Sequence, residues 1–182
     1  MDKPPMKMVI AAYLLVVSCQ HTHPDKFESG SRWGPLIDVL PKDIVPTLVT
    51  FDEDAYEALS DENLEANGKM AALQLVSAYF GDPKRGMREG IKDLLVDIIK
   101  SRIDPGADFP LECVDYAEFL RWISVMDSRS IAINGLIMIL PLAHMINFEP
   151  QPDRGEDMIK VVFGVYNTLD DDGSITVRSD RD

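Results

Sequence analysis

The chain has 182 residues, of which 46% are hydrophobic, so its length and composition suit one globular domain with a real core and exclude a disordered chain. Its 31 acidic and 18 basic residues give a formal net charge of −13 at pH 7. Nucleic-acid affinity depends on clustered lysine and arginine, so this balance argues against a nucleic-acid partner and favours cations, or basic and apolar peptides. An acidic surface that only keeps the protein soluble is the simpler alternative.

The first segment resembles a secretory signal peptide, because two lysines precede an apolar run over residues 8–17 and small and polar residues follow it. The letters VVSC also fit a bacterial lipoprotein cleavage box with Cys19 lipidated, which would bring the protein to a membrane. An ordinary buried strand or helix is the third interpretation. The protein is therefore expected to be secreted if Met1–Cys19 is a cleaved signal, and cytoplasmic otherwise.

The two cysteines, Cys19 and Cys113, lie far apart in the sequence and predict neither a disulfide framework nor a metal cluster. His21 and His23 begin a stretch rich in proline, glycine and serine, and no cysteine or carboxylate cluster completes a metal site around them. This stretch is expected to be a linker, with a short apolar hook near residues 33–40 that packs on the domain.

Three further segments predict helices. Asp52–Glu65 is acidic and reads as helix surface, and Lys69–Phe80 is a second helix that Gly81 and the residues after it end. The clearest amphipathic helix is Met87–Ile103. Its apolar stripe consists of Met87, Ile91, Leu94, Leu95, Ile98 and Ile99.

Two later segments carry oxygen-rich patterns that suit a calcium ion, which needs several carboxylate and carbonyl oxygens and a glycine at a sharp turn. Gly155–Asp182 combines apolar residues at helical spacing with the turn DDDG and a following Ile175. Upstream, VDYAEFLRW (114–122) places an apolar residue, Asp115 and Glu118 at the spacing of the second half of a calcium loop, whereas its first half lacks oxygen ligands.

These motifs resemble the EF-hand superfamily, in particular its calcineurin-B and neuronal-calcium-sensor branch. The resemblance implies a mostly α fold: a helix–loop–helix pair whose loops join through short strands at Val114 and Ile175, preceded by additional helices. Asp115 and Glu118 belong to the degenerate loop. The candidate calcium ligands of the other loop are Asn167, Asp170, Asp171, Asp172, Ile175 and Thr176.

The pattern departs from the family in three places. The second loop has Ser179 where the closing glutamate belongs, and its first ligand is Asn167 or Thr168 depending on the alignment. The chain stops where the last helix should begin, and an apolar insert at about 131–153 separates the matching blocks. Its Ile131–Ile146 part is too short to span a bilayer, so a buried helix is expected there.

The domain plan is a signal peptide or flexible N-terminus at 1–24, a helical region at 25–86, and the degenerate EF-hand pair at 87–182. The expected function is that of a non-enzymatic, sensor-like protein that binds calcium and a target protein or peptide helix. A secreted or lipid-anchored acidic interaction protein that binds no metal is the alternative. An enzyme is disfavoured because the nucleophile, metal and phosphate motifs of the common enzyme classes are missing from the sequence.

Overall fold

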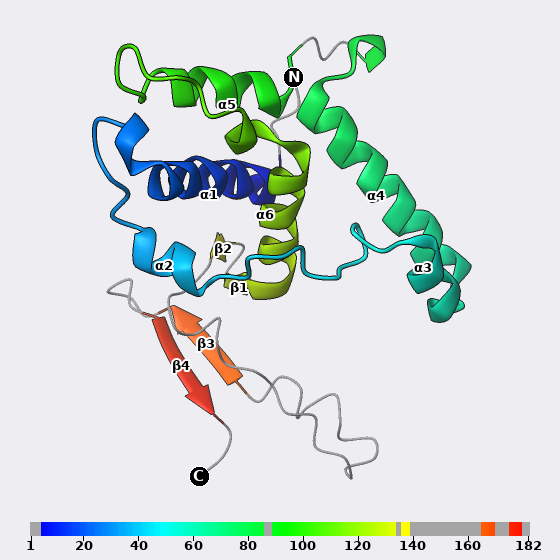
Figure 1. The fold of residues 1–182 in the computed structure, drawn as a ribbon. Coiled ribbons are helices and arrows are strands. Elements are labelled where there is room, and N and C mark those ends of the chain that lie inside the picture. Colours follow the sequence, from blue (N-terminus) through cyan, green and yellow to red (C-terminus); the bar gives the residue numbers. More distant parts are fainter. Residues whose placement is uncertain (1–4, 86–88, 134–135, 139–164, 170–174, 180–182) are drawn as a thin grey trace. The chain divides into compact units, whose positions relative to one another are not determined.

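A computed structural model describes residues 5–85, 89–133, 136–138, 165–169 and 175–179 (Figure 1). The chain divides into two compact units, Met1–Ser128 and Arg129–Asp182. The protein is mostly helical, as predicted, and its helices lie almost wholly in the first unit. They are α1 (Met6–Thr22), α2 (Gly34–Val39), α3 (Glu53–Leu59), α4 (Glu62–Phe80), α5 (Ile91–Lys100) and α6 (Tyr116–Arg129), with the short 3-10 helices η1 (Pro24–Lys26), η2 (Pro83–Arg85) and η3 (Leu111–Val114).

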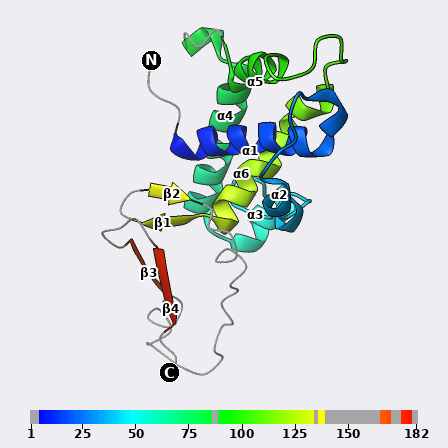
Figure 2. The same cartoon turned by 90° about the vertical axis from the view of Figure 1, so that its left-hand side faces the viewer.

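Helix α1 is the centre of the first unit, with α2, α5 and η3 packed against it. Figure 2 shows it crossing α6, and an ion pair between Lys7 and Asp127 joins these two helices. Every residue from Leu14 to Cys19 is buried, so the helix is enclosed on all sides in its second half. The apolar run that resembles a signal peptide is therefore a core helix in this structure. Within the described residues, none of the helices has the length and apolar character to cross a membrane.

Local capping explains where α3 and α4 begin and end. The Asp52 carboxylate accepts the Ala55 N–H at 2.9 Å and starts α3, and the Asp61 carboxylate accepts the N–H groups of the second and third residues of α4. Ser60, between the helices, adopts the left-handed conformation with φ 51°. The acidic segment predicted as helix surface is thus interrupted. Helix α4 ends at Phe80 as predicted, where Gly81 takes a positive φ of 80°.

The predicted hook and amphipathic helix are both present. Helix α2 turns Ile37 into the core, and Leu40 after it is also buried. Helix α5 covers the middle of the predicted Met87–Ile103 helix and buries Leu95 and Ile99.

The second unit contains two antiparallel hairpins. β1 (Ile131–Ile133) pairs with β2 (Leu136–Met138), and β3 (Val165–Leu169) pairs with β4 (Ile175–Ser179). The predicted buried helix at Ile131–Ile146 is wrong for these strand residues, and its remainder lies outside the described residues. The helical spacing of apolar residues in Gly155–Asp182 predicts a helix there, and this prediction is wrong for 165–169, because this β-branched and aromatic segment pairs as a strand with β4.

Candidate functional site

The residues predicted to bind calcium are distributed around a hairpin. Asn167 lies opposite Val177 in the β3–β4 ladder, while Ile175 and Thr176 lie opposite Leu169 and Thr168. Asp170, Asp171 and Asp172 belong to 170–174, which lies outside the described residues. The ladder thus places Asn167 on β3 and Ile175 and Thr176 on β4, whereas an EF-hand would have its entering helix at 165–169.

The predicted loop-pairing strands are not seen at the residues expected to form them. Val114 lies in the 3-10 helix η3, and Ile175 pairs with Leu169 inside its own hairpin. The helix–loop–helix pair of the EF-hand arrangement is therefore not confirmed.

Asp115 and Glu118, the carboxylates of the degenerate loop, have partners at the start of α6. The Asp115 carboxylate accepts the Ala117 N–H at 3.2 Å, and its backbone carbonyl accepts the Phe119 N–H, so Asp115 caps the helix. One Glu118 oxygen, Oε2, accepts hydrogen bonds from both Nε and Nη2 of Arg121, at 3.1 and 2.9 Å. Among the described residues, no group of three His, Cys, Asp or Glu side chains is placed to hold a metal ion.

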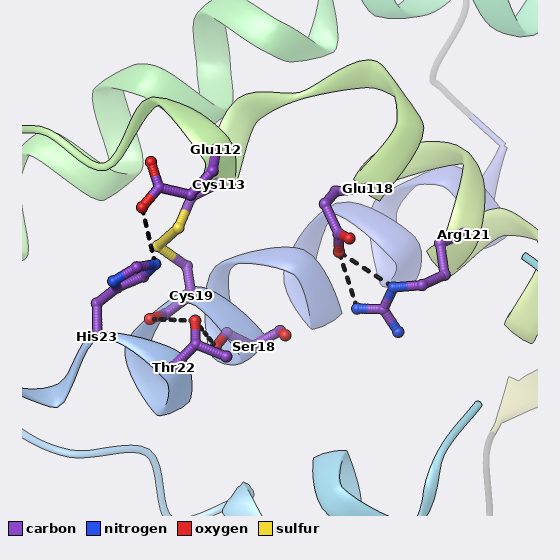
Figure 3. The surroundings of a disulfide bond; sticks show 8 residues. All are labelled: Ser18, Cys19, Thr22, His23, Glu112, Cys113, Glu118 and Arg121. Atoms are coloured by element: carbon purple, nitrogen blue, oxygen red, sulfur yellow. Dashed lines mark hydrogen bonds and ion pairs between the residues drawn. A yellow bond between two sulfur atoms is a disulfide. The ribbon is translucent and has the colours of Figure 1, made fainter. Parts of the chain in front are cut away.

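A disulfide joins the two cysteines that lie 94 residues apart (Figure 3). Cys19 comes from the buried end of α1 and Cys113 from η3, and both side chains are buried. On one side of the bond, His23 Nε2 lies 3.1 Å from Glu112 Oε1. Sequence separation alone gave no indication of this pairing, which depends on η3 packing against α1.

A cavity of about 340 Å³ lies beside this disulfide, and its charged side chains have polar partners within the chain. Arg121 is 7% exposed and, besides Glu118, donates to the Pro41 carbonyl at 2.8 Å. Lys42 donates to the Ile37 carbonyl at 2.9 Å. The cavity is lined by Leu15, Ser18, Cys19, Thr22, His23, Ile37, Lys42, Glu112, Cys113, Glu118 and Arg121. These pairings tie the linker after α2 to α6, and the arrangement holds the unit together.

A larger groove of about 700 Å³ lies between the end of α4, α5, η3 and the start of α6. Its lining is mainly apolar and aromatic, with lysines from α5 on one edge and carboxylates from the η3–α6 segment on another. The lining residues are Phe80, Lys92, Val96, Lys100, Phe109, Leu111, Glu112, Val114, Asp115 and Tyr116. Two apolar side chains in it stay open to solvent: Leu111 is 74% exposed and Phe80 is 50% exposed.

The wall of the groove is rigidly built. The Tyr79 hydroxyl donates to the Val114 carbonyl at 2.5 Å, which holds η3 against α4. The Tyr79 ring stacks on Phe119 at a centroid distance of 4.9 Å, and Phe80 packs against Tyr116 at 5.6 Å. Burial, with a smaller effect of the Asp115 charge, raises the pKa of Tyr79 to about 12, and burial also raises the pKa of Tyr116. Both phenols therefore stay neutral at physiological pH.

Asp115 stands out in the sequence as part of a degenerate calcium loop, whereas the groove that it borders does not. Its apolar members come from four segments between residues 80 and 116, and no periodic pattern connects them. The one feature of the sequence that could have indicated the groove is Leu111, an apolar residue between Pro110 and Glu112 that belongs to no helical stripe. Comparison of the chain with family models, with curated proteins and with solved structures gave no match.

Proposed function

We propose that this protein is a non-enzymatic interaction protein that binds a short apolar segment of a partner protein in the groove between α4, α5 and η3. The observation that carries the proposal is Leu111, which has the highest exposed fraction, 74%, of the large apolar side chains in the described part of the chain. Leu111 lies in the 3-10 helix η3, which the disulfide anchors, and it lines the aromatic groove. Its exposure to water is unfavourable, and contact with an apolar side chain of a partner would remove this cost.

The charges around the groove define the chemistry of the partner. Lys92 and Lys100 lie on α5, and Glu112 and Asp115 lie on the η3–α6 segment. A peptide with an apolar or aromatic anchor and flanking charges of both signs complements this arrangement. The charges would set orientation and association rate, while the apolar anchor would supply most of the affinity. A target protein or peptide helix of this kind is the partner class that the sequence predicted.

Catalysis is not part of the proposal because the best-formed polar cluster, around the disulfide, pairs its charges internally. Arg121 is occupied by Glu118 and Pro41, and His23 lies against Glu112. A general base or nucleophile needs a free partner within hydrogen-bond reach of substrate.

The disulfide also bears on the alternative of a secreted or lipid-anchored protein. Disulfides persist in oxidising compartments, which supports an extracytoplasmic location. Cleavage of Met1–Cys19 as a signal is not part of this proposal, because α1 is a core helix and Cys19 is bonded to Cys113. A lipid anchor at Cys19 is not proposed, because its sulfur is bonded to Cys113.

A peptide-display selection on the full chain tests the groove. Selected peptides should bind the Leu111→Asp variant at least about tenfold more weakly, since a charge at the mouth replaces a hot-spot contact. Val39→Asp is the matched control, because Val39 is 52% exposed on α2 and away from the groove lining. Peptides that bind both variants equally well would overturn the proposal.

Calcium binding at Asn167, Asp170, Asp171, Asp172, Ile175 and Thr176 stays a prediction of the sequence. The strand at Val165–Leu169 replaces part of the helix on which the EF-hand resemblance rested. Isothermal titration with calcium, repeated on Asp170→Ala and Asp172→Ala, tests it directly. Millimolar affinity that both variants abolish would support a site at the turn, and heat that persists in both variants would place the ion elsewhere.

A further inference from the structure

The 3-10 helix η3 belongs both to the groove and to the cavity beside the disulfide. Leu111, Glu112 and Val114 line the groove, while Glu112 and Cys113 line the cavity. Figure 3 shows Glu112 and Cys113 next to each other on this turn, with Cys113 bonded to Cys19 of α1. The disulfide thus fixes the segment that carries the exposed leucine of the groove.

Two other contacts hold the ends of η3. Pro110, directly before it, is fully buried, and the carbonyl of Val114, its last residue, accepts the Tyr79 hydroxyl. Glu112 also lies 3.1 Å from His23, but its side chain is 61% exposed, so this pair adds little. A 3-10 helix of four residues has poor hydrogen-bond geometry and does not keep its conformation alone. Between its two ends, η3 is therefore held by its covalent link to α1.

We propose that the Cys19–Cys113 disulfide is a redox switch for the groove, so that the oxidised chain binds the partner segment and the reduced chain releases it. This inference rests on the proposed function of the groove. In the oxidised chain Leu111 is already ordered, so binding does not spend free energy on ordering it. In the reduced chain the two sulfurs cannot stay at bonding distance, and the cavity of about 340 Å³ gives η3 room to shift.

The reductant that the switch requires is a small dithiol. Cys19 and Cys113 are only 2% and 6% exposed, and the cavity that both of them line provides the approach to their sulfurs. A thiolate of the dithiol attacks one sulfur, the bond between the cysteines breaks, and the released cysteine takes up a proton. The second thiol of the reductant then displaces the other cysteine. The products are two cysteine thiols and the oxidised, cyclic disulfide of the reductant, so two electrons and two protons pass to the chain.

The size of the effect follows from the ordering of η3. Fixing the backbone of one residue costs about a tenfold factor in an equilibrium constant, and Leu111 is at least one such residue. Its ends stay anchored at Pro110 and Val114, so the change is confined to the turn between them. Reduction should therefore weaken binding without unfolding the helices.

Fluorescence anisotropy of a cysteine-free peptide, selected by display on the oxidised full chain, tests the switch. Reduction with dithiothreitol should weaken binding at least about tenfold, and reoxidation should restore it. As the control, Cys19→Ala/Cys113→Ala should bind as weakly as the reduced chain and should not respond to dithiothreitol. Equal affinity of the oxidised and reduced chains would overturn the switch and leave the proposed function intact, provided that Leu111→Asp weakens binding. If Leu111→Asp has no effect on the oxidised chain, the proposed function fails and the switch fails with it.

A second measurement does not depend on any peptide. The NMR order parameter of the Leu111 amide, which reports motion on the picosecond to nanosecond timescale, should fall from about 0.85 in the oxidised chain to below about 0.6 in the reduced chain. The Phe119 amide, bonded to the Asp115 carbonyl in α6, should stay near about 0.85 in both. Far-UV circular dichroism should keep its helical signal, because a disulfide acts mainly on the unfolded chain. A reduced chain that is unfolded, or a Leu111 amide as rigid as in the oxidised chain, would overturn the proposal.

Discussion

Breaking the Cys19–Cys113 disulfide should strongly destabilise the first unit. The bond closes a loop over a sequence separation of 94 residues, for which the chain-entropy model gives about 4.7 kcal/mol. The neighbouring His23–Glu112 pair is partly exposed and contributes at most about 1 kcal/mol. The double variant Cys19→Ala/Cys113→Ala is therefore expected to lose about 3–5 kcal/mol of unfolding free energy.

Urea denaturation measures this loss, because the buried Trp122 on α6 becomes exposed to solvent when the helices separate. With an m-value of about 2 kcal/mol/M, the midpoint should fall by about 1.5–2.5 M. Adding a reductant to the wild type should give the same midpoint as the double variant, and reductant should not affect the double variant. A wild-type midpoint that does not respond to reductant, or two reactive thiols in the unreduced unfolded chain, would refute the reasoning.

Three further changes test the packing around the groove and α4. Gly68→Ala should destabilise by about 1–3 kcal/mol despite the better helix propensity of alanine, because its Cβ would clash with the Tyr56 hydroxyl and lie 2.8 Å from the Leu48 carbonyl oxygen. Thermal unfolding measures this loss, and a stabilised variant would contradict the close contact. Asp61→Ala should cost about 1 kcal/mol by removing the α4 cap, with Asp61→Asn as the control that keeps it; equal loss in both would contradict the capping role. Because the pKa of Tyr79 is raised to about 12, the native state keeps a phenol proton that the unfolded state loses above about pH 10. The contribution of Tyr79 to the unfolding free energy is therefore fully present below about pH 10. It should fall by about 1.4 kcal/mol per pH unit between about pH 10 and about pH 12. Tyr79→Phe should lack this alkaline decline, and an unchanged slope would assign it to other groups.

Helices α4 and α5 could be predicted because their apolar spacing and end signals agree. Asp61 as a cap, Gly81 as a stop and the stripe of α5 all have the local chemistry that the structure uses. The observed helix boundaries differ from the predicted ones at Ser60, whose left-handed conformation ends α3 before α4 begins.

The role of α1 could not be decided from the sequence, because a signal peptide and a core helix both require about ten apolar residues in a row. Burial from Leu14 to Cys19 follows only from long-range packing with α5 and η3. The Cys19–Cys113 pairing depends on the same packing and was missed for the same reason.

The segment Val165–Ser179 shows a different error. Its apolar residues fit a helical period, but Val165, Tyr166 and Thr168 also favour strand, and the acidic glycine-containing turn suits a hairpin as well as a calcium loop. Over five residues the two periodicities cannot be separated, so the family resemblance decided the prediction. The strand pairing of Leu169 with Ile175 corrects it.

Backbone amide NMR of the full chain, titrated with a peptide selected by display, tests the proposed function most directly. If the groove is the binding site, the largest shift changes should fall on its lining, especially on Phe109, Leu111 and Tyr116. The α2 residues around Val39 should stay unchanged. Shift changes confined to α2, or to α4 without Leu111, would contradict the assignment of partner binding to this groove.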